Sequence, residues 1–185
     1  MEAARHLWDY KEERINGKVY LMSPSGSFFH GAVNGNIYSI LKRHLKNSLC
    51  YASVENLDLL IDDDYLQPDI MLICDRRSIK KNGYRGVPRF VVETLSPSTA
   101  KRDRTEKKDI YERIGVDEYW IVSPIERSIE IYYLEDGRYI LQEVATLLDA
   151  DDKDYNGDTV IALRSNPEIT FVLAEIFEGL DDIGE

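Results

Sequence analysis

The sequence predicts a mixed α/β fold in which a central mixed β-sheet is flanked by helices. Two stretches, 29–45 and 103–115, place apolar residues at intervals of three and four, which is the period of an amphipathic helix. The runs between and after them are short and rich in β-branched and aromatic residues, as strands are. Because 185 residues suit one buried core, we expect a single domain over residues 1–185.

The first half of the chain predicts a hairpin turn, the first long helix and a second hairpin. Residues 15–18 (Ile-Asn-Gly-Lys) have Asn-Gly at the centre of a turn, and the strand-like run 19–22 follows. After the helix, the runs 51–61 and 70–74 are predicted to be strands. The three aspartates at 62–64 would form the turn between them.

The second half predicts a strand, a helix and a parallel strand, followed by a further hairpin. The run 89–95 is apolar and β-branched, and the helix after it should end at Gly115, a favoured residue just beyond a helix C-terminus. The strand 119–122 then completes a right-handed crossover. Residues 128–134 and 139–144 flank Glu-Asp-Gly-Arg, which indicates a hairpin. A final strand and a short helix are expected after an acidic loop.

The charge distribution is uneven along the chain. The net charge of −11 argues against a protein that coats nucleic acid non-specifically, since that binding depends on Lys and Arg. Residues 76–108, however, contain eleven basic and three acidic side chains. This segment favours either an ordinary solvated surface or a local surface that faces a polyanion.

The sequence also bears on compartment and on cysteine chemistry. No stretch approaches the roughly 18 apolar residues of a membrane helix, and the charged N-terminus lacks a secretory signal, so we expect a cytoplasmic protein without membrane contact. Cys50 and Cys74 are isolated in apolar surroundings. We interpret them as structural thiols, with neither a disulfide nor a zinc site indicated.

Two carboxylates lie inside apolar runs and need an explanation. Asp69 begins Asp-Ile-Met-Leu-Ile, and Glu93 lies within Phe-Val-Val-Glu-Thr-Leu. An ionised carboxylate in a core costs several kcal/mol unless a partner or a metal compensates it. Taken singly, each could instead cap a strand end or pair with an arginine.

A lysine on the second helix is predicted to face the sheet. Ile110, Tyr111 and Ile114 define the apolar side of that helix and lie three, four and seven residues beyond Lys107. Lys108 is rotated by about 100° and should be solvated. The alternative is that Lys107 extends past the edge of the apolar stripe into solvent.

These residues belong to an ordered series that resembles a known family. The series is Glu13, His30, Pro68-Asp69, Glu93-x-Leu-Ser-Pro-Ser-Thr, Asp103-x-x-x-Lys107, Tyr111 and Gly115-Val116-x-Glu118-Tyr119-Trp120-Ile121-Val122. It is similar to the Uma-two family of restriction-endonuclease-like proteins, a branch of the PD-(D/E)XK nuclease superfamily. The usual superfamily lysine stands two residues after the acidic one, where this chain has Leu95, and the Uma-two family shows the same relocation to the following helix.

The resemblance implies a restriction-endonuclease-like core that hydrolyses phosphodiester bonds. Asp69 and Glu93 would bind Mg²⁺ or Mn²⁺, with the Thr94 carbonyl completing the ligands, and Lys107 would be the third catalytic residue. Glu13 could add a carboxylate to the metal, or be an exposed charge before a turn. His30 faces inward and is either a supporting residue of the site or a hydrogen-bonded structural histidine.

The expected partner is DNA, and paired active sites for two strands would suit a homodimer. The basic side chains expected to contact nucleic acid are Arg85, Lys101, Arg102 and Arg104. The alternative function is a catalytically weak or inactive module that keeps the fold to bind nucleic acid or a protein. Other chemistries have little support, since the chain lacks GxSxG, P-loop, HExxH and CxxC motifs.

Overall fold

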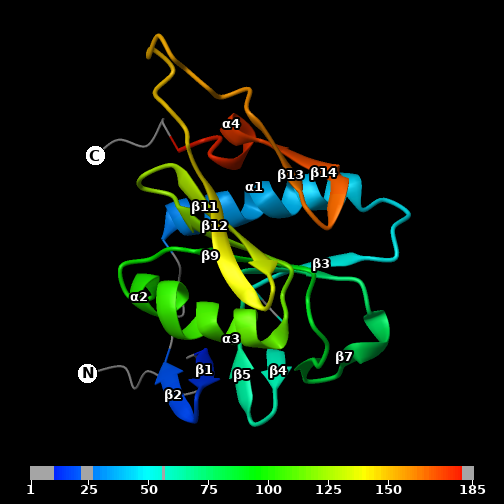
Figure 1. The fold of residues 1–185 in the computed structure, drawn as a ribbon. Coiled ribbons are helices and arrows are strands. Elements are labelled where there is room, and N and C mark those ends of the chain that lie inside the picture. Colours follow the sequence, from blue (N-terminus) through cyan, green and yellow to red (C-terminus); the bar gives the residue numbers. More distant parts are fainter. Residues whose placement is uncertain (1–10, 22–26, 56, 181–185) are drawn as a thin grey trace, which may run out of the picture.

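The structure is a computed structural model that describes residues 11–21, 27–55 and 57–180. A six-stranded mixed sheet forms its centre, with the strand order β12-β11-β10-β9-β6-β3 (Figure 1). Strands β9 and β10 are parallel, whereas the other neighbours in this sheet are antiparallel, which confirms the predicted mixed sheet. Its strands are β3 (Tyr51–Val54), β6 (Ile70–Ile73), β9 (Phe90–Thr94), β10 (Glu118–Ser123), β11 (Ser128–Glu135) and β12 (Arg138–Thr146).

A second sheet has the strand order β2-β1-β5-β4-β8-β7, and a separate hairpin joins β13 to β14. The β1–β2 turn uses Asn16 and Gly17, both at positive φ (50° and 75°), as a two-residue hairpin requires. Asp64 accepts hydrogen bonds from both turn amides at 2.8 and 3.0 Å. These strands are β1 (Glu12–Ile15), β2 (Lys18–Leu21), β4 (Leu59–Ile61), β5 (Asp64–Leu66), β7 (Ile79–Lys80), β8 (Gly83–Tyr84), β13 (Val160–Leu163) and β14 (Asn166–Val172).

Helices cover both faces of the central sheet (Figure 1). On one face lies α1, which begins after Ser27, whose hydroxyl accepts a hydrogen bond from the His30 amide at 3.2 Å. On the other face a continuous helical stretch ends at Gly115, where φ is 88°. No helix in the described ranges is long and apolar enough to cross a membrane. The helical segments are α1 (Phe28–His44), η2 (Arg76–Ser78), α2 (Ala100–Arg102), the π-helical η3 (Asp103–Lys107), α3 (Lys108–Ile114) and α4 (Leu173–Ile176).

The two faces of the central sheet pack into two different cores. On the α1 side, Val92 and Trp120 join Ile37 of α1 and Phe171 of β14 in an apolar cluster. The opposite cluster brings residues of α3 and of the second sheet against alternate side chains of the same strands. Because successive strand residues point to opposite faces, β9 directs Glu93 away from the α1 side. A charged residue is therefore placed beneath the helical stretch that carries Lys107.

Two predicted strands differ from the structure. The run 51–61 is not one strand: β3 pairs with β6 in the central sheet, whereas β4 pairs with β5 in the second sheet. The chain changes sheets at Glu55, whose φ is 52°. Near the C-terminus, a hairpin of two strands stands where one final strand is predicted. In both places the strand propensity is right, and long-range pairing decides which sheet each segment joins.

The interpretation of the cysteines as separate thiols is wrong, because Cys50 and Cys74 form a disulfide. Tyr51 pairs with Ile73 in the β3–β6 ladder, so the two cysteines face each other just beyond it. A bridge that closes a loop of 24 residues stabilises a fold by roughly 3 kcal/mol.

Candidate active site

Lys107 lies at the centre of a buried group of carboxylates. Its ammonium Nζ is 2.9 Å from Glu93 Oε1, 2.9 Å from Glu13 Oε1 and 3.7 Å from Asp103 Oδ1. The four residues come from β1, β9 and η3, and each side chain is at most 3% exposed. The inward direction predicted for Lys107 is therefore confirmed. Lys108 is not simply solvated, because its Nζ lies 3.9 Å from the centre of the Tyr132 ring.

Asp69 lies at the point where β6 meets the end of β9. Ile70 pairs with Val92 in the antiparallel ladder, so continuing this register by one residue places Asp69 opposite Glu93. Asp69 Oδ2 accepts a hydrogen bond from the Thr94 amide at 2.7 Å. The two carboxylates that stand out in the sequence are therefore neighbours across two strands.

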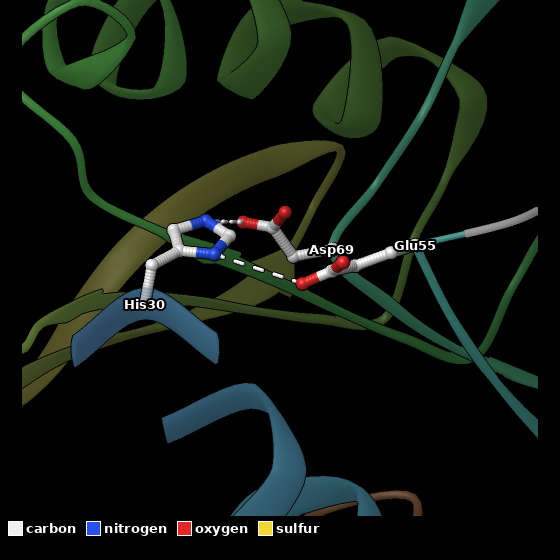
Figure 2. Close-up of side chains that lie close together, drawn as sticks. All are labelled: His30, Glu55 and Asp69. Carbon is white, nitrogen blue, oxygen red and sulfur yellow. Dashed lines mark hydrogen bonds and ion pairs between the residues drawn. The ribbon is translucent and has the colours of Figure 1, made fainter. Parts of the chain in front are cut away.

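A histidine and two carboxylates form a second group beside the first (Figure 2). His30 Nε2 lies 3.2 Å from Asp69 Oδ2, and its Nδ1 lies 3.6 Å from Glu55 Oε1. Asn34 donates to Glu55 Oε1 at 2.8 Å and accepts from the Thr94 hydroxyl at 2.6 Å. His30, Glu55 and Asp69 can each direct one ligand atom at a common point, which makes them candidates for holding a metal ion.

The electrostatics of the site follow from burial and excess negative charge. Burial raises the pKa of Glu93 well above its usual range, although Lys107 opposes this. Burial also raises the pKa of Asp103. For Lys107, burial by itself lowers the pKa, but the carboxylates, with Glu93 the strongest, outweigh it and the pKa is raised. Lys107 is consequently an ammonium at neutral pH.

The pKa of His30 is also set by burial and by neighbouring carboxylates, which act in opposite directions. Burial lowers its pKa, but the hydrogen bond and charge of Asp69, followed by the charge of Glu55, raise it overall. A raised pKa means that the site favours positive charge at this position.

The carboxylate oxygens around Lys107 are not all satisfied. Glu13 Oε2 and both carboxylate oxygens of Asp103 are buried without a hydrogen-bond partner among the described residues. One ammonium thus faces Glu13, Glu93 and Asp103, with Asp69 close enough to raise its pKa as well. Oxygen donors with surplus negative charge match what Mg²⁺ and Mn²⁺ prefer, so the residues fit a divalent cation.

Two residues of the site were missed in the sequence. In the sequence, Glu55 falls within the run 51–61 that is predicted to be one strand, and Asn34 looks like a polar residue within a helix. The signal for Glu55 is conformational, because its φ of 52° is unusual for a residue other than glycine, and such backbone is concentrated at functional sites. The signal for Asn34 is its place four residues after His30, on the same face of α1.

A cleft of about 770 Å³ opens onto these groups. Lys101 and Arg102, at the start of the helical stretch, line it, and Ser96, Ser98 and Thr99 add hydroxyl groups. The guanidinium of Arg102 stacks on Tyr20 with 4.5 Å between its central carbon and the ring centre. The predicted site residues that line the cleft are His30, Asp69, Glu93, Lys101, Arg102 and Lys107.

The other predicted residues take different places. Glu13 is fully buried below Lys107, and its Oε1 also accepts the Gln67 amide at 2.9 Å. Arg104 pairs with Glu130 through two hydrogen bonds of 2.9 and 2.7 Å. Arg85 is exposed at the end of β8. Neither arginine is among the residues that line the cleft.

Comparison with known proteins agrees with the fold and the resemblance. Residues 5–160 match the Uma2 family, which is described as "Putative restriction endonuclease". An uncharacterized protein of Synechocystis sp. is 31% identical over 131 residues, which cover 68% of this chain and 67% of that protein. A crystal structure from Anabaena variabilis, described as "a putative nuclease belonging to DUF820", is 20% identical, superposes with a TM-score of 0.71 and covers 91% of this chain and 90% of its own. At this identity the superposition shows a common fold. From the extent of the family match, the chain belongs to the Uma2 family, the Uma-two family of restriction-endonuclease-like proteins.

Proposed function

We propose that this protein is an endonuclease that hydrolyses phosphodiester bonds in DNA with Mg²⁺ or Mn²⁺. The observation that supports this most directly is convergence: Asp69, Glu93 and Lys107 come from separate elements and line one cleft with Lys101 and Arg102. Two carboxylates, a charged lysine and flanking cations are the groups that phosphodiester hydrolysis requires.

The ligands of the cation would come from two overlapping sets. Asp69 and Glu93 are the pair implied by the resemblance, with the Thr94 carbonyl as a third donor. His30 and Glu55 lie on the other side of Asp69 and would extend this set. When bound, a divalent cation supplies Lewis acidity and lowers the pKa of a coordinated water.

The protein's own residues have separable tasks in this proposal. Lys107 stays protonated because its pKa is raised, so it cannot be the general base. Its ammonium instead stabilises negative charge that develops on the phosphate. Glu13 and Asp103 hold that ammonium in place from below. Lys101 and Arg102 would contact the flanking phosphates, since they lie at the rim of the cleft.

A supercoiled-plasmid assay with Mg²⁺ or Mn²⁺ tests this proposal. We expect nicking that Asp69→Asn and Glu93→Gln reduce by about 100-fold or more. Glu118→Gln is a matched control, because it changes another buried carboxylate of the central sheet, outside the residues that line the cleft. Nicking that is equal in wild type, Asp69→Asn and Glu93→Gln would contradict the assignment.

One observation favours the alternative of a catalytically inactive binding module. Glu93 Oε1 is already occupied by Lys107 at 2.9 Å and by the Tyr111 hydroxyl at 2.5 Å, a closed arrangement that needs no metal. Such a protein would bind DNA and leave the plasmid intact under every metal condition. The proposed homodimer is independent of this choice, and light scattering on the purified protein measures it directly.

A further inference from the structure

A groove outside the catalytic cleft lies along β3, which is an edge strand of the central sheet. Its volume is about 600 Å³, and it lies between α1 on one side and the η2–β7 segment on the other. Aromatic, aliphatic and basic side chains line it together: Tyr38, Tyr51, Val54, Leu57, Arg76 and Ile79. Tyr51 is 42% exposed, so part of its ring is open to a ligand.

The groove continues from the cleft along one side of α1. His30, Asn34, Tyr38 and Lys42 recur at intervals of four residues and so follow one face of the helix. His30 lines the cleft and Tyr38 lines the groove, about 12 Å further along the helix axis. The groove and the cleft adjoin at the end of β3. Val54, the last residue of the strand, lines the groove, and Glu55, the next residue, lines the cleft.

The cations at this groove lack carboxylate partners. Lys42, Lys46 and Arg76 form no ion pair with any residue in the described ranges, whereas the neighbouring Arg43 pairs with Glu175. Lys42 Nζ lies 5.9 Å from the Tyr38 ring centre and 5.7 Å from that of Tyr51. Within the part of the chain that the structure describes, Arg76 donates to the carbonyls of Ser48 and Cys50, at 3.5 and 3.4 Å. Their positive charge is therefore available to an anion.

The segments that form the groove stand out in an acidic chain. Residues 15–54 and 76–92 contain no Asp or Glu, although the net charge of the protein is −11. At the borders of these segments, Glu55 follows β3 and Asp75 precedes η2. Two of their arginines are paired across the fold, Arg43 with Glu175 and Arg89 with Asp117. Together the two segments carry ten basic side chains: Lys18, Lys42, Arg43, Lys46, Arg76, Arg77, Lys80, Lys81, Arg85 and Arg89.

We propose that this groove binds a single DNA strand and leads it to or from the catalytic cleft. Bases stack on the ring of Tyr51 and contact the apolar wall, while Lys42 and Arg76 contact phosphates. A single strand fits better than a duplex, because exposed aromatic rings and aliphatic side chains bind unstacked base faces. The inference rests on the proposed function for the choice of DNA as the ligand.

Fluorescence anisotropy with a labelled oligothymidylate of about 16 nucleotides tests the groove. The measurement is made in EDTA, so that binding is separated from hydrolysis. We expect Tyr51→Ala to weaken binding by about five-fold or more, and Tyr51→Phe to retain it because the ring remains. Arg76→Ala should weaken binding and lower the dependence of log K on log salt by about 0.7.

Tyr155→Ala is the matched control, since Tyr155 is 45% exposed and lies in the loop between β12 and β13. It should bind as wild type does. Equal affinity of wild type, Tyr51→Ala and Arg76→Ala would overturn the inference even if the plasmid is cut. A duplex that competes as well as the single strand would also overturn it. Groove-dependent binding by a protein that cuts no plasmid would support the groove and contradict only the proposed hydrolysis.

Discussion

The central sheet buries two glutamates on adjacent strands, and their surroundings are opposite in kind. Glu118 begins β10 and Glu93 lies on β9, and both are at most 2% exposed. Each oxygen of Glu118 has one fixed donor: Trp120 Nε1 at 2.8 Å and the Arg164 amide at 2.8 Å. Burial raises the pKa of Glu118 to about 7, and the two hydrogen bonds partly oppose this.

Glu93 instead belongs to a group of buried carboxylates that carries more negative charge than its one lysine can balance. Among the described residues, its neighbours Glu13 and Asp103 keep buried oxygens without partners, and a single ammonium serves all three carboxylates. Glu93 also lines a cleft, whereas Glu118 is not among the residues that line it. The comparison teaches that burial alone does not mark a functional carboxylate. In the function proposed above, surplus charge beside an opening does, because it leaves a place for a cation.

Removal of Lys107 should show the surplus charge most strongly. Lys107→Met is expected to lower the free energy of unfolding by about 3–5 kcal/mol near pH 8, because three carboxylates lose their counter-charge in the interior. Part of this should return at a lower pH, since burial raises the pKa values of Glu93 and Asp103 and protonation then removes their charge. Urea unfolding at both pH values measures the effect.

Lys108→Met is the control for this experiment, as the ammonium of the adjacent lysine lies over the Tyr132 ring and forms no ion pair with any described residue. Its cost should be about 1 kcal/mol or less and independent of pH. Equal losses of unfolding free energy in the two variants would mean that the carboxylates around Lys107 do not depend on its positive charge for stability.

Glu118 provides a pH dependence with a defined sign. Its pKa is about 7 in the folded protein against an ordinary 4.5, so its contribution to stability is complete below about pH 4.5 and is lost as pH rises toward 7. The loss is at most about 3 kcal/mol. Glu118→Gln cannot ionise and should flatten this part of the stability profile, with plasmid nicking unchanged. A profile identical to that of wild type would place the titration elsewhere.

A divalent cation should distinguish the carboxylates of the cleft from Glu118 thermodynamically. Mn²⁺ at about 100 times its dissociation constant is expected to add about 2.7 kcal/mol to the free energy of unfolding. Asp69→Asn should abolish this gain, whereas Glu118→Gln should keep it. Thermal melts with and without EDTA measure both variants, and an undiminished gain in Asp69→Asn would remove that residue from the cation site.

Replacement of Glu55 should give the smallest of these effects. It should weaken cation binding without lowering stability. Because Glu55 has a φ of 52°, Glu55→Gly relieves backbone strain and should leave stability unchanged or raise it by about 1 kcal/mol. The stabilisation by Mn²⁺ should nevertheless decrease. Asp62→Gly is matched in backbone, at φ 54°, and should keep the full Mn²⁺ effect. A full Mn²⁺ effect in Glu55→Gly would exclude this carboxylate from the ligands.

Local sequence patterns predicted most of the fold and the centre of the site. The helical period separated Lys107 from Lys108, and the structure buries Lys107 as that period requires. Asp69 and Glu93 stood out because a carboxylate in an apolar run is energetically costly. The DNA contacts of the arginines stay a prediction, since charge along a sequence does not tell which cations are already paired, as Arg104 is with Glu130.

By itself, the sequence determined which segments become helices and strands and which charged residues must face the interior, because periodicity and the cost of burying charge act over a few neighbouring residues. Only the tertiary structure decided that Cys50 meets Cys74, that Glu55 turns toward His30 and that Glu13 supports Lys107. Those contacts depend on strand register and on which sheet a segment joins. Both are set by pairing between residues far apart in the chain.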